Sequence, residues 1–148
     1  MNHKSKLTVA GMILTAAVAL LSGCATPLNS AQKSELNAYQ AKGLEIQEKT
    51  PQTGAVLGIL PGGGSFYARQ YGLGVVNLLV WPFSILWDPI SGYEGSRAIN
   101  YYATKSAADK NLRKEMSLLD DKLTLGQITK EEYIKSKRAL EAKYSADL

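Results

Sequence analysis

An uncharged stretch in the middle of the chain constrains most strongly what this sequence can fold into. Residues 72–87 contain no Asp, Glu, Lys or Arg, and a glycine-rich segment around Pro61 precedes them. A helix of 15 residues is about 22 Å long, whereas the hydrocarbon core of a bilayer is about 30 Å thick. Residues 54–93 therefore predict an apolar hairpin that associates with a membrane as a tilted, re-entrant or interfacial element. Three of its aromatic residues are expected at the level of the lipid headgroups: Trp81, Trp87 and Tyr93.

The composition of the chain excludes several broad classes. Among its 148 residues, 45% are hydrophobic, which is too many for a disordered chain. There are 17 Lys and Arg residues against 13 Asp and Glu residues. The resulting charge of +4 is small for a nucleic-acid-binding protein, so we expect no nucleic-acid partner. A single cysteine cannot form an internal disulfide framework.

The first 23 residues have the organisation of a secretory signal peptide. Lys4 and Lys6 precede an apolar run over residues 7–21, and the small residues Ser22 and Gly23 follow it. The alternative is an N-terminal transmembrane anchor. The apolar run is shorter than the roughly 20 residues that cross a bilayer, which favours the signal peptide.

The sequence Leu21-Ser22-Gly23-Cys24 resembles the lipobox of bacterial lipoproteins. The resemblance implies that diacylglycerol is attached to the Cys24 thiol and that a peptidase cuts between Gly23 and Cys24. It also implies that the new amino group is acylated by a fatty acid such as palmitate. Ala25 stands where an aspartate would retain a lipoprotein in the inner membrane, so the resemblance implies sorting to the outer membrane.

Removal of the leader changes what chemistry the chain can perform. The mature chain of 125 residues loses Lys4 and Lys6, which leaves 15 basic and 13 acidic residues and a formal charge of +2. It also loses the single histidine, His3, while the single cysteine, Cys24, becomes the lipid attachment point. Without histidine or a free thiol, it cannot assemble a Ser-His-Asp or Cys-His site or a zinc site with the usual ligands. We therefore predict a protein that is not an enzyme and has no metal and no cofactor besides the lipid.

Asp88 differs from the other acidic residues of the chain. Most of them lie in polar, helical stretches beside Lys or Arg, where a solvated helix face explains them. Asp88 instead directly follows the apolar run and precedes Pro89. We expect it to cap or anchor an interface and not to act in catalysis.

Residues 24–53 predict a lipid-anchored tether followed by a helix. The tether has no hydrophobic periodicity, and Asn29 or Ser30 is a suitable N-cap for the helix. The helix is expected to end before Pro51, because the residue that precedes a proline is driven out of the helical region. Four residues of this helix form a narrow packing stripe: Leu36, Tyr39, Gly43 and Ile46.

The apolar segment contains the motif Pro61-Gly62-Gly63-Gly64-Ser65-Phe66-Tyr67, then Gly72 and Gly74, then the apolar run that ends at Trp87-Asp88. This motif resembles the two-transmembrane hairpin domain of bacterial and eukaryotic membrane proteins. The resemblance implies two short apolar helices joined by a glycine-rich turn, in or on a membrane. The residues assigned to this membrane hairpin are Gly62, Gly64, Phe66, Tyr67, Trp81, Trp87 and Asp88.

The glycines before Pro61 admit two interpretations. Gly54, Gly58 and Gly62 are four residues apart, a spacing that lets helices approach closely in lipid. Alternatively they are turn glycines around Pro61, which would interrupt any regular helix at this point. No Gly-Lys-Ser or Gly-Lys-Thr follows them, which excludes a phosphate-binding P-loop.

Residues 94–148 predict an amphipathic helical hairpin. Leu112, Met116, Leu119 and Leu123 recur at helical spacing in a stretch from residue 97 to residue 125 without Pro or Gly. Gly126 follows as a C′ residue, and residues 129–132 form a T-x-x-E capping box that begins the next helix.

Residues 118–140 resemble the short C-terminal domain, SHOCT, which has a leucine helix, a glycine, Ile-Thr, two acidic residues, an aromatic residue and a Lys-rich helix. The resemblance implies oligomerisation or binding of a partner protein. The alternative is that the hairpin packs on other helices of its own chain. The residues assigned to partner binding are Leu119, Leu123, Tyr133 and Leu140.

Together these features predict a mostly α-helical bacterial lipoprotein of the cell envelope. The expected function is that of a membrane-anchored scaffold or interaction module, with membrane lipid, a second copy or an envelope protein as partner. The alternative is a membrane-perturbing lipoprotein, or one that excludes phages or plasmids. The periplasmic face of the outer membrane is the expected location, although the resemblance to the two-transmembrane hairpin argues for the inner membrane.

Overall fold

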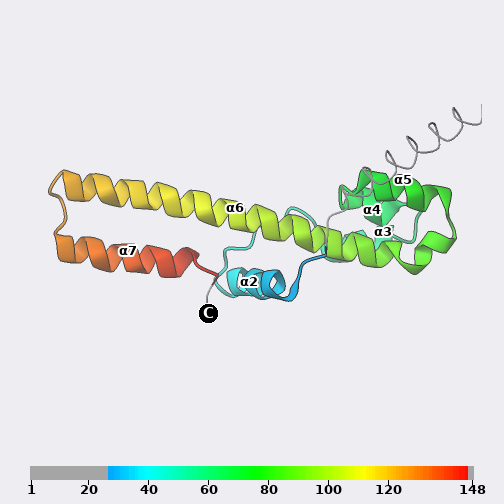
Figure 1. The fold of residues 1–148 in the computed structure, drawn as a ribbon, viewed down its shortest axis with the longest axis horizontal. Helices are drawn as coiled ribbons and strands as arrows, with labels where there is room; N and C mark the ends of the chain where they lie inside the picture. Colours follow the sequence, from blue (N-terminus) through cyan, green and yellow to red (C-terminus); the bar gives the residue numbers. More distant parts are fainter. Residues whose placement is uncertain (1–26, 147–148) are drawn as a thin grey trace, which may run out of the picture. The chain divides into compact units, whose positions relative to one another are not determined.

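The computed structural model describes residues 27–146, and these residues are mostly helical, as predicted. The predicted signal peptide and Cys24 lie outside the described residues. The elements in chain order are α2 (Ser30–Ala41), α3 (Pro51–Leu57), α4 (Gly63–Tyr67), α5 (Tyr71–Leu79), the 3₁₀ helix η1 (Phe83–Leu86), α6 (Asp88–Thr124) and α7 (Lys130–Tyr144) (Figure 1).

The chain divides into two compact units. Within the described residues, unit 1 consists of Pro27 and Lys49–Ala98, and unit 2 consists of Leu28–Glu48 and residues 99–146. Unit 1 therefore holds α3, α4, α5, η1 and the first three turns of α6. Unit 2 holds α2, the remainder of α6 and α7.

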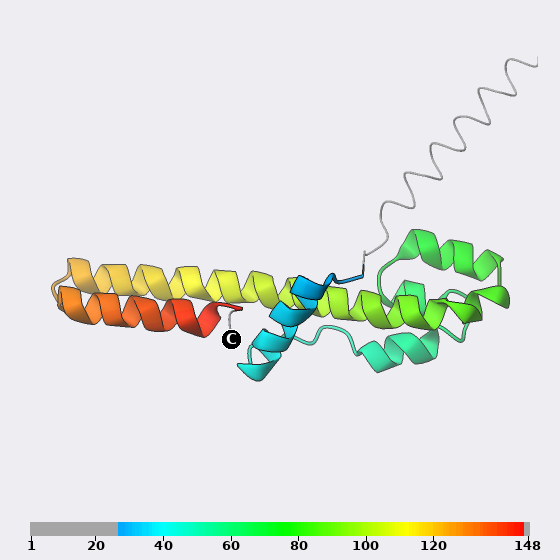
Figure 2. The same ribbon diagram turned by 60° about the horizontal axis from the view of Figure 1, so that its bottom comes forward.

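The helices of unit 1 pack through very close backbone contacts. Gly54 of α3 lies against Gly92 of α6, and Gly58 lies against Pro89, so these two helices run antiparallel. Figure 2 shows α3 and α5 on different sides of the first turns of α6. None of the helices within residues 27–146 combines the length and the apolar character that crossing a bilayer requires.

Unit 2 is built around a small hydrophobic core that joins its three helices. Tyr39 of α2, Ala108 of α6 and Tyr144 of α7 form its centre. Leu44, Leu112, Leu140 and Ala146 pack against this centre. The predicted turn between α6 and α7 is confirmed, because Gly126 adopts a positive φ of 67° and the Thr129 side chain accepts a hydrogen bond from the Glu132 backbone.

Two predicted helix boundaries are wrong. The helix that was expected to continue to Thr50 ends at Ala41, because Gly43 turns the chain with a φ of 68° and the Leu44 N–H bonds to the Tyr39 carbonyl. Pro51 begins a new helix, a position where its missing N–H has no cost. The helical hairpin is expected from residue 94 onward, whereas its first helix, α6, begins at Asp88.

Candidate functional site

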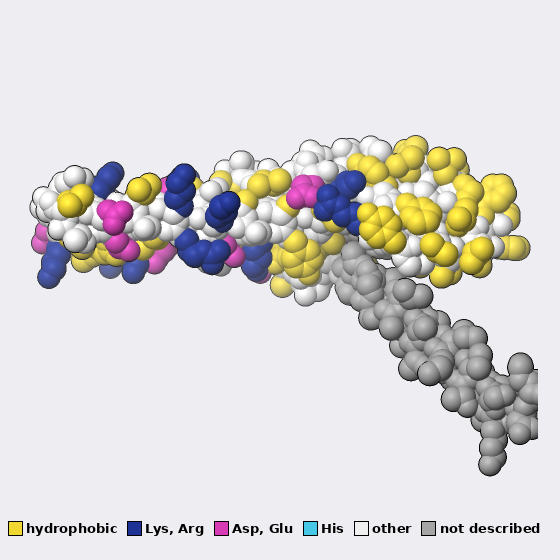
Figure 3. Space-filling view, turned by 90° about the horizontal axis from the view of Figure 1, so that it is seen from above, with side chains coloured by type: hydrophobic (Ala, Val, Ile, Leu, Met, Phe, Trp, Pro, Cys, Tyr) yellow, Lys and Arg dark blue, Asp and Glu magenta, His cyan; other side chains and the backbone are white. Residues whose placement is uncertain are grey.

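The surface of unit 1 has the reverse of the usual distribution of polar and apolar side chains. Its fully buried side chains are largely polar, whereas the aliphatic and aromatic ones face outward, and Figure 3 shows them covering one face. The buried polar residues are Ser65, Gln70, Asn77, Ser84, Asp88 and Ser96. The exposed apolar residues are Val56, Ile59, Leu60, Tyr71, Val75, Val76, Leu78, Leu79, Val80, Trp81, Phe83, Ile85, Leu86, Trp87 and Ile90.

Asp88 is the centre of the buried polar network. Its side chain is 0% exposed, and its Oδ2 accepts the Gly64 N–H at 3.1 Å. Its Oδ1 accepts the Ser65 N–H at 3.0 Å, the Ser65 hydroxyl at 2.5 Å and the Asn77 amide at 2.7 Å. The Asn77 oxygen in turn accepts the Trp87 indole N–H at 2.8 Å.

This network holds α4, α5 and α6 together. The carboxylate lies at the beginning of α4, where the backbone N–H groups of Gly64 and Ser65 have no partner within the helix. A buried carboxylate is tolerated when several donors replace the water that it loses. Asp88 is thus an anchor between helices of unit 1, to which Gly64, Ser65 and Asn77 all belong.

The glycines of unit 1 serve the close approach of its helices. A Cβ atom on Gly54 would collide with the Gly92 carbonyl, and one on Gly64 would lie 2.9 Å from Gly58 Cα. Gly62 has a different role, because its φ of 69° is a turn conformation that favours glycine. The two interpretations of these glycines therefore apply to different members: Gly54 and Gly58 lie at a helix contact, and Gly62 lies in the turn.

The other residues assigned to the membrane hairpin lie in different parts of unit 1. Phe66 packs beside Gly74, so that α4 and α5 approach closely. The Tyr67 hydroxyl accepts the Thr50 N–H at 3.1 Å, and the Lys49 ammonium lies 4.4 Å from the centre of its ring. Of the two tryptophans, Trp87 joins the polar network through its indole N–H, and both Trp81 and Trp87 are exposed.

Sequence reasoning missed Ser65 and Asn77 as members of the network. Both are fully buried. Asn77 and Ser84 are the two non-glycine polar residues within the uncharged run of residues 72–87, and both point inward. A polar residue in an otherwise apolar run is the signal that could have identified Asn77, because a buried amide is normally hydrogen-bonded. Ser65 lies outside this run and carries no such signal.

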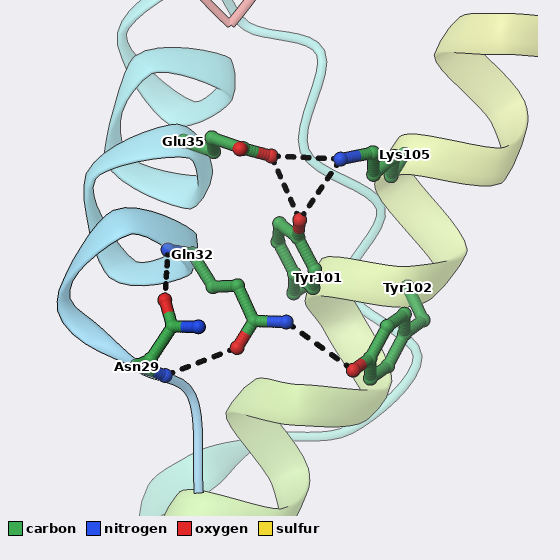
Figure 4. A network of polar contacts seen from close by, with 6 residues as sticks. All are labelled: Asn29, Gln32, Glu35, Tyr101, Tyr102 and Lys105. Atoms are coloured by element: carbon green, nitrogen blue, oxygen red, sulfur yellow. Dashed lines mark hydrogen bonds and ion pairs between the residues drawn. The ribbon is translucent and has the colours of Figure 1, made fainter.

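A second polar network stabilises unit 2 (Figure 4). Glu35 Oε2 accepts the Tyr101 hydroxyl at 2.7 Å and the Lys105 ammonium at 3.0 Å. The hydrogen bond from Tyr101, together with that from Lys105, holds the pKa of Glu35 below its usual value. The Lys105 ammonium also donates to the Tyr101 hydroxyl at 3.1 Å, and this bond, followed by the bond to Glu35, raises the pKa of Lys105. This network attaches α2 to α6.

The four residues assigned to partner binding contribute mainly to the inside of the α6–α7 hairpin. Leu119 is buried, while Leu123, Tyr133 and Leu140 are partly buried. Leu140 packs on the core of unit 2, and the Tyr133 hydroxyl donates to Asp120 at 2.8 Å. This arrangement corresponds to the alternative in which the hairpin packs on its own chain.

The outer surface of the hairpin offers other apolar groups. A groove of about 440 Å³ runs between α6 and α7, and Leu118, Leu125 and Ile134 are exposed. The residues lining the groove are Glu115, Leu118, Leu119, Lys122, Ser136, Ala139 and Leu140.

Within residues 27–146, no group of three or more His, Cys, Asp or Glu side chains is placed to hold a metal ion. Comparison with protein-family models, curated proteins and solved structures finds no match to this chain.

Proposed function

We propose that this chain is a lipoprotein of the bacterial cell envelope that acts as a scaffold or interaction module and not as an enzyme. Lipid on Cys24 and the apolar surface of unit 1 attach it to the membrane, and the α6–α7 hairpin of unit 2 binds a partner. The periplasmic face of the outer membrane is the proposed location.

The observation that carries this proposal is the reversed surface of unit 1. A soluble domain exposes single apolar side chains, but a contiguous apolar surface indicates a membrane or protein contact. Burial of Asp88 and Asn77 with their hydrogen-bond partners removes polar groups from that surface. One acyl chain alone binds a membrane only marginally, whereas the three chains expected on Cys24, together with the apolar surface of unit 1, would make attachment effectively permanent.

Attachment through Cys24 can be tested in cells. Labelled palmitate is expected to enter the wild-type protein and not a Cys24→Ala variant, and the wild type is expected in the outer-membrane fraction of a density gradient. Ala25→Asp is the matched change for sorting and should move the protein to the inner membrane. Equal labelling of wild type and Cys24→Ala would refute the lipid anchor.

Partner binding by unit 2 can be tested with a photo-crosslinking residue at Leu125, whose side chain is exposed beside the hairpin turn. We expect a crosslinked adduct in intact cells. The same probe at Lys110, an exposed polar position of α6, is the matched control. Monomers alone from both positions would contradict the scaffold function.

A membrane-perturbing or exclusion function is the second candidate. The observation that favours it is the amount of apolar surface on unit 1, because inserting such a surface displaces lipid. It predicts increased dye permeability or reduced phage sensitivity on expression. Unchanged permeability and phage sensitivity would refute it and leave the scaffold function in place.

A further inference from the structure

We propose that unit 1 inserts into a single leaflet as a wedge, with its charged end at the lipid headgroups and its apolar end near the middle of the bilayer. The inference rests on the proposed membrane contact of unit 1 and adds its orientation and depth. The charged end is defined as Lys49, Arg69, Glu94 and Arg97. The apolar end is defined as residues 58–62 and 79–87.

The chain passes back and forth between these two ends. Helix α3 begins after Lys49 and leads to Gly58, which lies against Pro89. Helix α4 returns from Gly64, which contacts Asp88, to Ala68, which lies against Gly95. Helix α5 then leads away again, and α6 returns from its first residue toward Arg97. The α3–α4 and α5–α6 connections therefore lie at the apolar end, and the α4–α5 connection lies at the charged end.

All charged residues of unit 1 except one belong to the charged end. Lys49 precedes α3, Arg69 lies between α4 and α5, and Glu94 and Arg97 follow in the second and third turns of α6. The exception, Asp88, is fully buried and has four hydrogen-bond donors. Insertion of the apolar end would therefore bring no exposed charged group of the described part of unit 1 into contact with the hydrocarbon core.

The apolar end carries the most exposed hydrophobic side chains of unit 1. Leu79 and Leu86 are each 78% exposed, and Phe83 is 70% exposed. Exposed apolar residues also occur on α3 and on α5, which lie on different sides of α6 (Figure 2). An apolar surface on several sides fits immersion in lipid better than docking of one flat partner surface.

The length of unit 1 corresponds to one leaflet. The nine residues of α5 extend about 13.5 Å at 1.5 Å per residue. The path along α6 from Asp88 to Arg97 has about the same length. One half of a hydrocarbon core of about 30 Å is about 15 Å, so the apolar end reaches the middle of the bilayer when the charged end lies at the headgroups.

The internal bond of Trp87 removes a reason for this ring to stay at the headgroups. Tryptophan is enriched at the interface because its indole N–H finds polar partners there. In unit 1 the Trp87 N–H already donates to Asn77 at 2.8 Å. The wedge therefore places Trp81 and Trp87 deep, in contrast to the headgroup level that the sequence alone predicts.

The lipid attachment point is compatible with the same leaflet. Pro27 lines a small cavity of about 130 Å³ together with Gln70, Glu94 and Gly95, at the charged end. Cys24 precedes Pro27 by three residues, a reach of about 10 Å at most. Lipid on Cys24 would therefore enter the bilayer at the headgroup level of unit 1.

Tryptophan fluorescence can measure the depth, because Trp81 and Trp87 are the two tryptophans of the whole chain. The lipidated full chain is reconstituted in phosphatidylethanolamine and phosphatidylglycerol vesicles that contain phosphatidylcholine brominated either near the headgroup or near the chain ends. We expect stronger quenching by bromine near the chain ends. Stronger quenching near the headgroup would overturn the wedge and leave the membrane contact standing. Protein that fails to float with the vesicles would refute the membrane contact itself.

Thiol labelling separates a single-leaflet wedge from a hairpin that spans the membrane. Phe83→Cys and Leu125→Cys introduce thiols at positions that are each 70% exposed, one at the apolar end and one in unit 2. A membrane-impermeant maleimide on the same side of the membrane as the hairpin of unit 2 is expected to label Leu125→Cys at least tenfold faster than Phe83→Cys. This holds both for protein inserted from outside, with the reagent added outside, and for protein inserted from inside, with the reagent sealed in the vesicles. Rapid labelling of Phe83→Cys from the side opposite Leu125 would show that the hairpin spans and would overturn the inference.

A charge at the apolar end tests the same placement by affinity. In a non-lipidated Cys24→Ser background, Leu79→Lys is expected to reduce partitioning into the vesicles on the order of 100-fold. Leu125→Lys is the matched control and should change it by less than about threefold. Equal effects of both changes would overturn the wedge. Burial of Leu79 in a dimer that forms with rising protein concentration in the absence of vesicles would also overturn it.

Discussion

Asn77 donates its amide to Asp88 Oδ1 at 2.7 Å, and both side chains are completely buried in unit 1. The other end of the same amide accepts the Trp87 indole, so Asn77 is held from both sides. Apolar contacts alone do not favour association of helices in lipid, where the surrounding chains are equally apolar. Polar contacts of this kind, together with close glycine packing, give α4, α5 and α6 a defined arrangement.

Removal of the Asp88 carboxylate should destabilise unit 1 strongly. Asp88→Ala leaves the Gly64 and Ser65 N–H groups buried without an acceptor, and the Asn77 amide keeps only the Ser65 hydroxyl as an acceptor. We expect a loss of about 3 kcal/mol or more in the free energy of unfolding. Urea unfolding in detergent micelles, followed by circular dichroism, measures the loss. Asp121→Ala, an exposed position of α6, should change the free energy by less than about 0.5 kcal/mol. Equal effects would contradict the role of Asp88 as an anchor.

The coupling between Asp88 and Asn77 can be measured directly. Because the two side chains share one network, the costs of Asp88→Ala and Asn77→Ala should not add. The double variant is expected to be more stable than the sum of the single costs predicts, by about 1 kcal/mol or more. Additive costs within about 0.3 kcal/mol would show that the two residues act independently.

Gly92→Ala should destabilise unit 1 even though alanine favours a helix. A Cβ on Gly92 would collide with the Gly54 carbonyl oxygen and lie 2.8 Å from Gly64 Cα. We expect the overlap to cost about 1–3 kcal/mol, which exceeds the helix propensity that alanine gains. Thermal unfolding in micelles measures the change. Ser106→Ala, at an exposed position of the same helix, is the matched control, and a Gly92→Ala protein as stable as this control would refute the close contact.

Local signals predicted part of the fold correctly. Gly126 and the Thr129–Glu132 capping box lie within one turn of the boundaries that they define, so the sequence contains all the groups involved. The end of α2 was misplaced because two breakers compete, Gly43 and Pro51. The apolar spacing favoured the later one, whereas Leu44 packs on the core of unit 2 and turns the chain at Gly43.

The polar interior of unit 1 could not be predicted in the same way. Asn77 and Ser65 are 12 residues apart, and their contact depends on how α4 and α5 pack. The apolar run indicates a membrane-associated segment, but periodicity alone does not say which side of each helix is buried. Asp88 was recognised as an anchor from its position after that run, while its partners required the tertiary structure.

Acid should weaken unit 2 through Glu35. The pKa of Glu35 is lowered from about 4.5 in the folded protein, first by the Tyr101 hydrogen bond and then by Lys105, so folding favours its charged form. The resulting stability is present above about pH 4.5 and is lost as the pH falls through the lower, folded pKa. Because Glu35 and Lys105 are partly exposed, we expect an effect of about 0.5–1 kcal/mol.

The measurement compares the free energy of unfolding at about pH 7 with that at about pH 3, because glutamate carboxylates titrate between these two values. Glu35→Gln should remove about 0.5–1 kcal/mol at neutral pH and flatten the dependence below about pH 4.5. Glu131→Gln, at an exposed position of α7, is the matched substitution. A pH dependence of Glu35→Gln identical to that of the wild type would exclude Glu35 as its source.

The start of α7 should depend on Thr129 more than on its neighbour Lys130. The Thr129 hydroxyl accepts the Glu132 N–H at 3.2 Å, and the Glu132 carboxylate accepts the Thr129 N–H at 2.8 Å. That backbone bond lowers the pKa of Glu132, so its charged form is favoured in the folded hairpin. Thr129→Ala removes one side of this pair and is expected to cost about 1 kcal/mol. Hydrogen exchange should then be about fivefold faster in the first turn of α7, while Lys130→Ala should leave it near the wild-type rate. Because the other end of α7 is held by Tyr144 in the core of unit 2, faster exchange throughout the helix would contradict a local role of this cap.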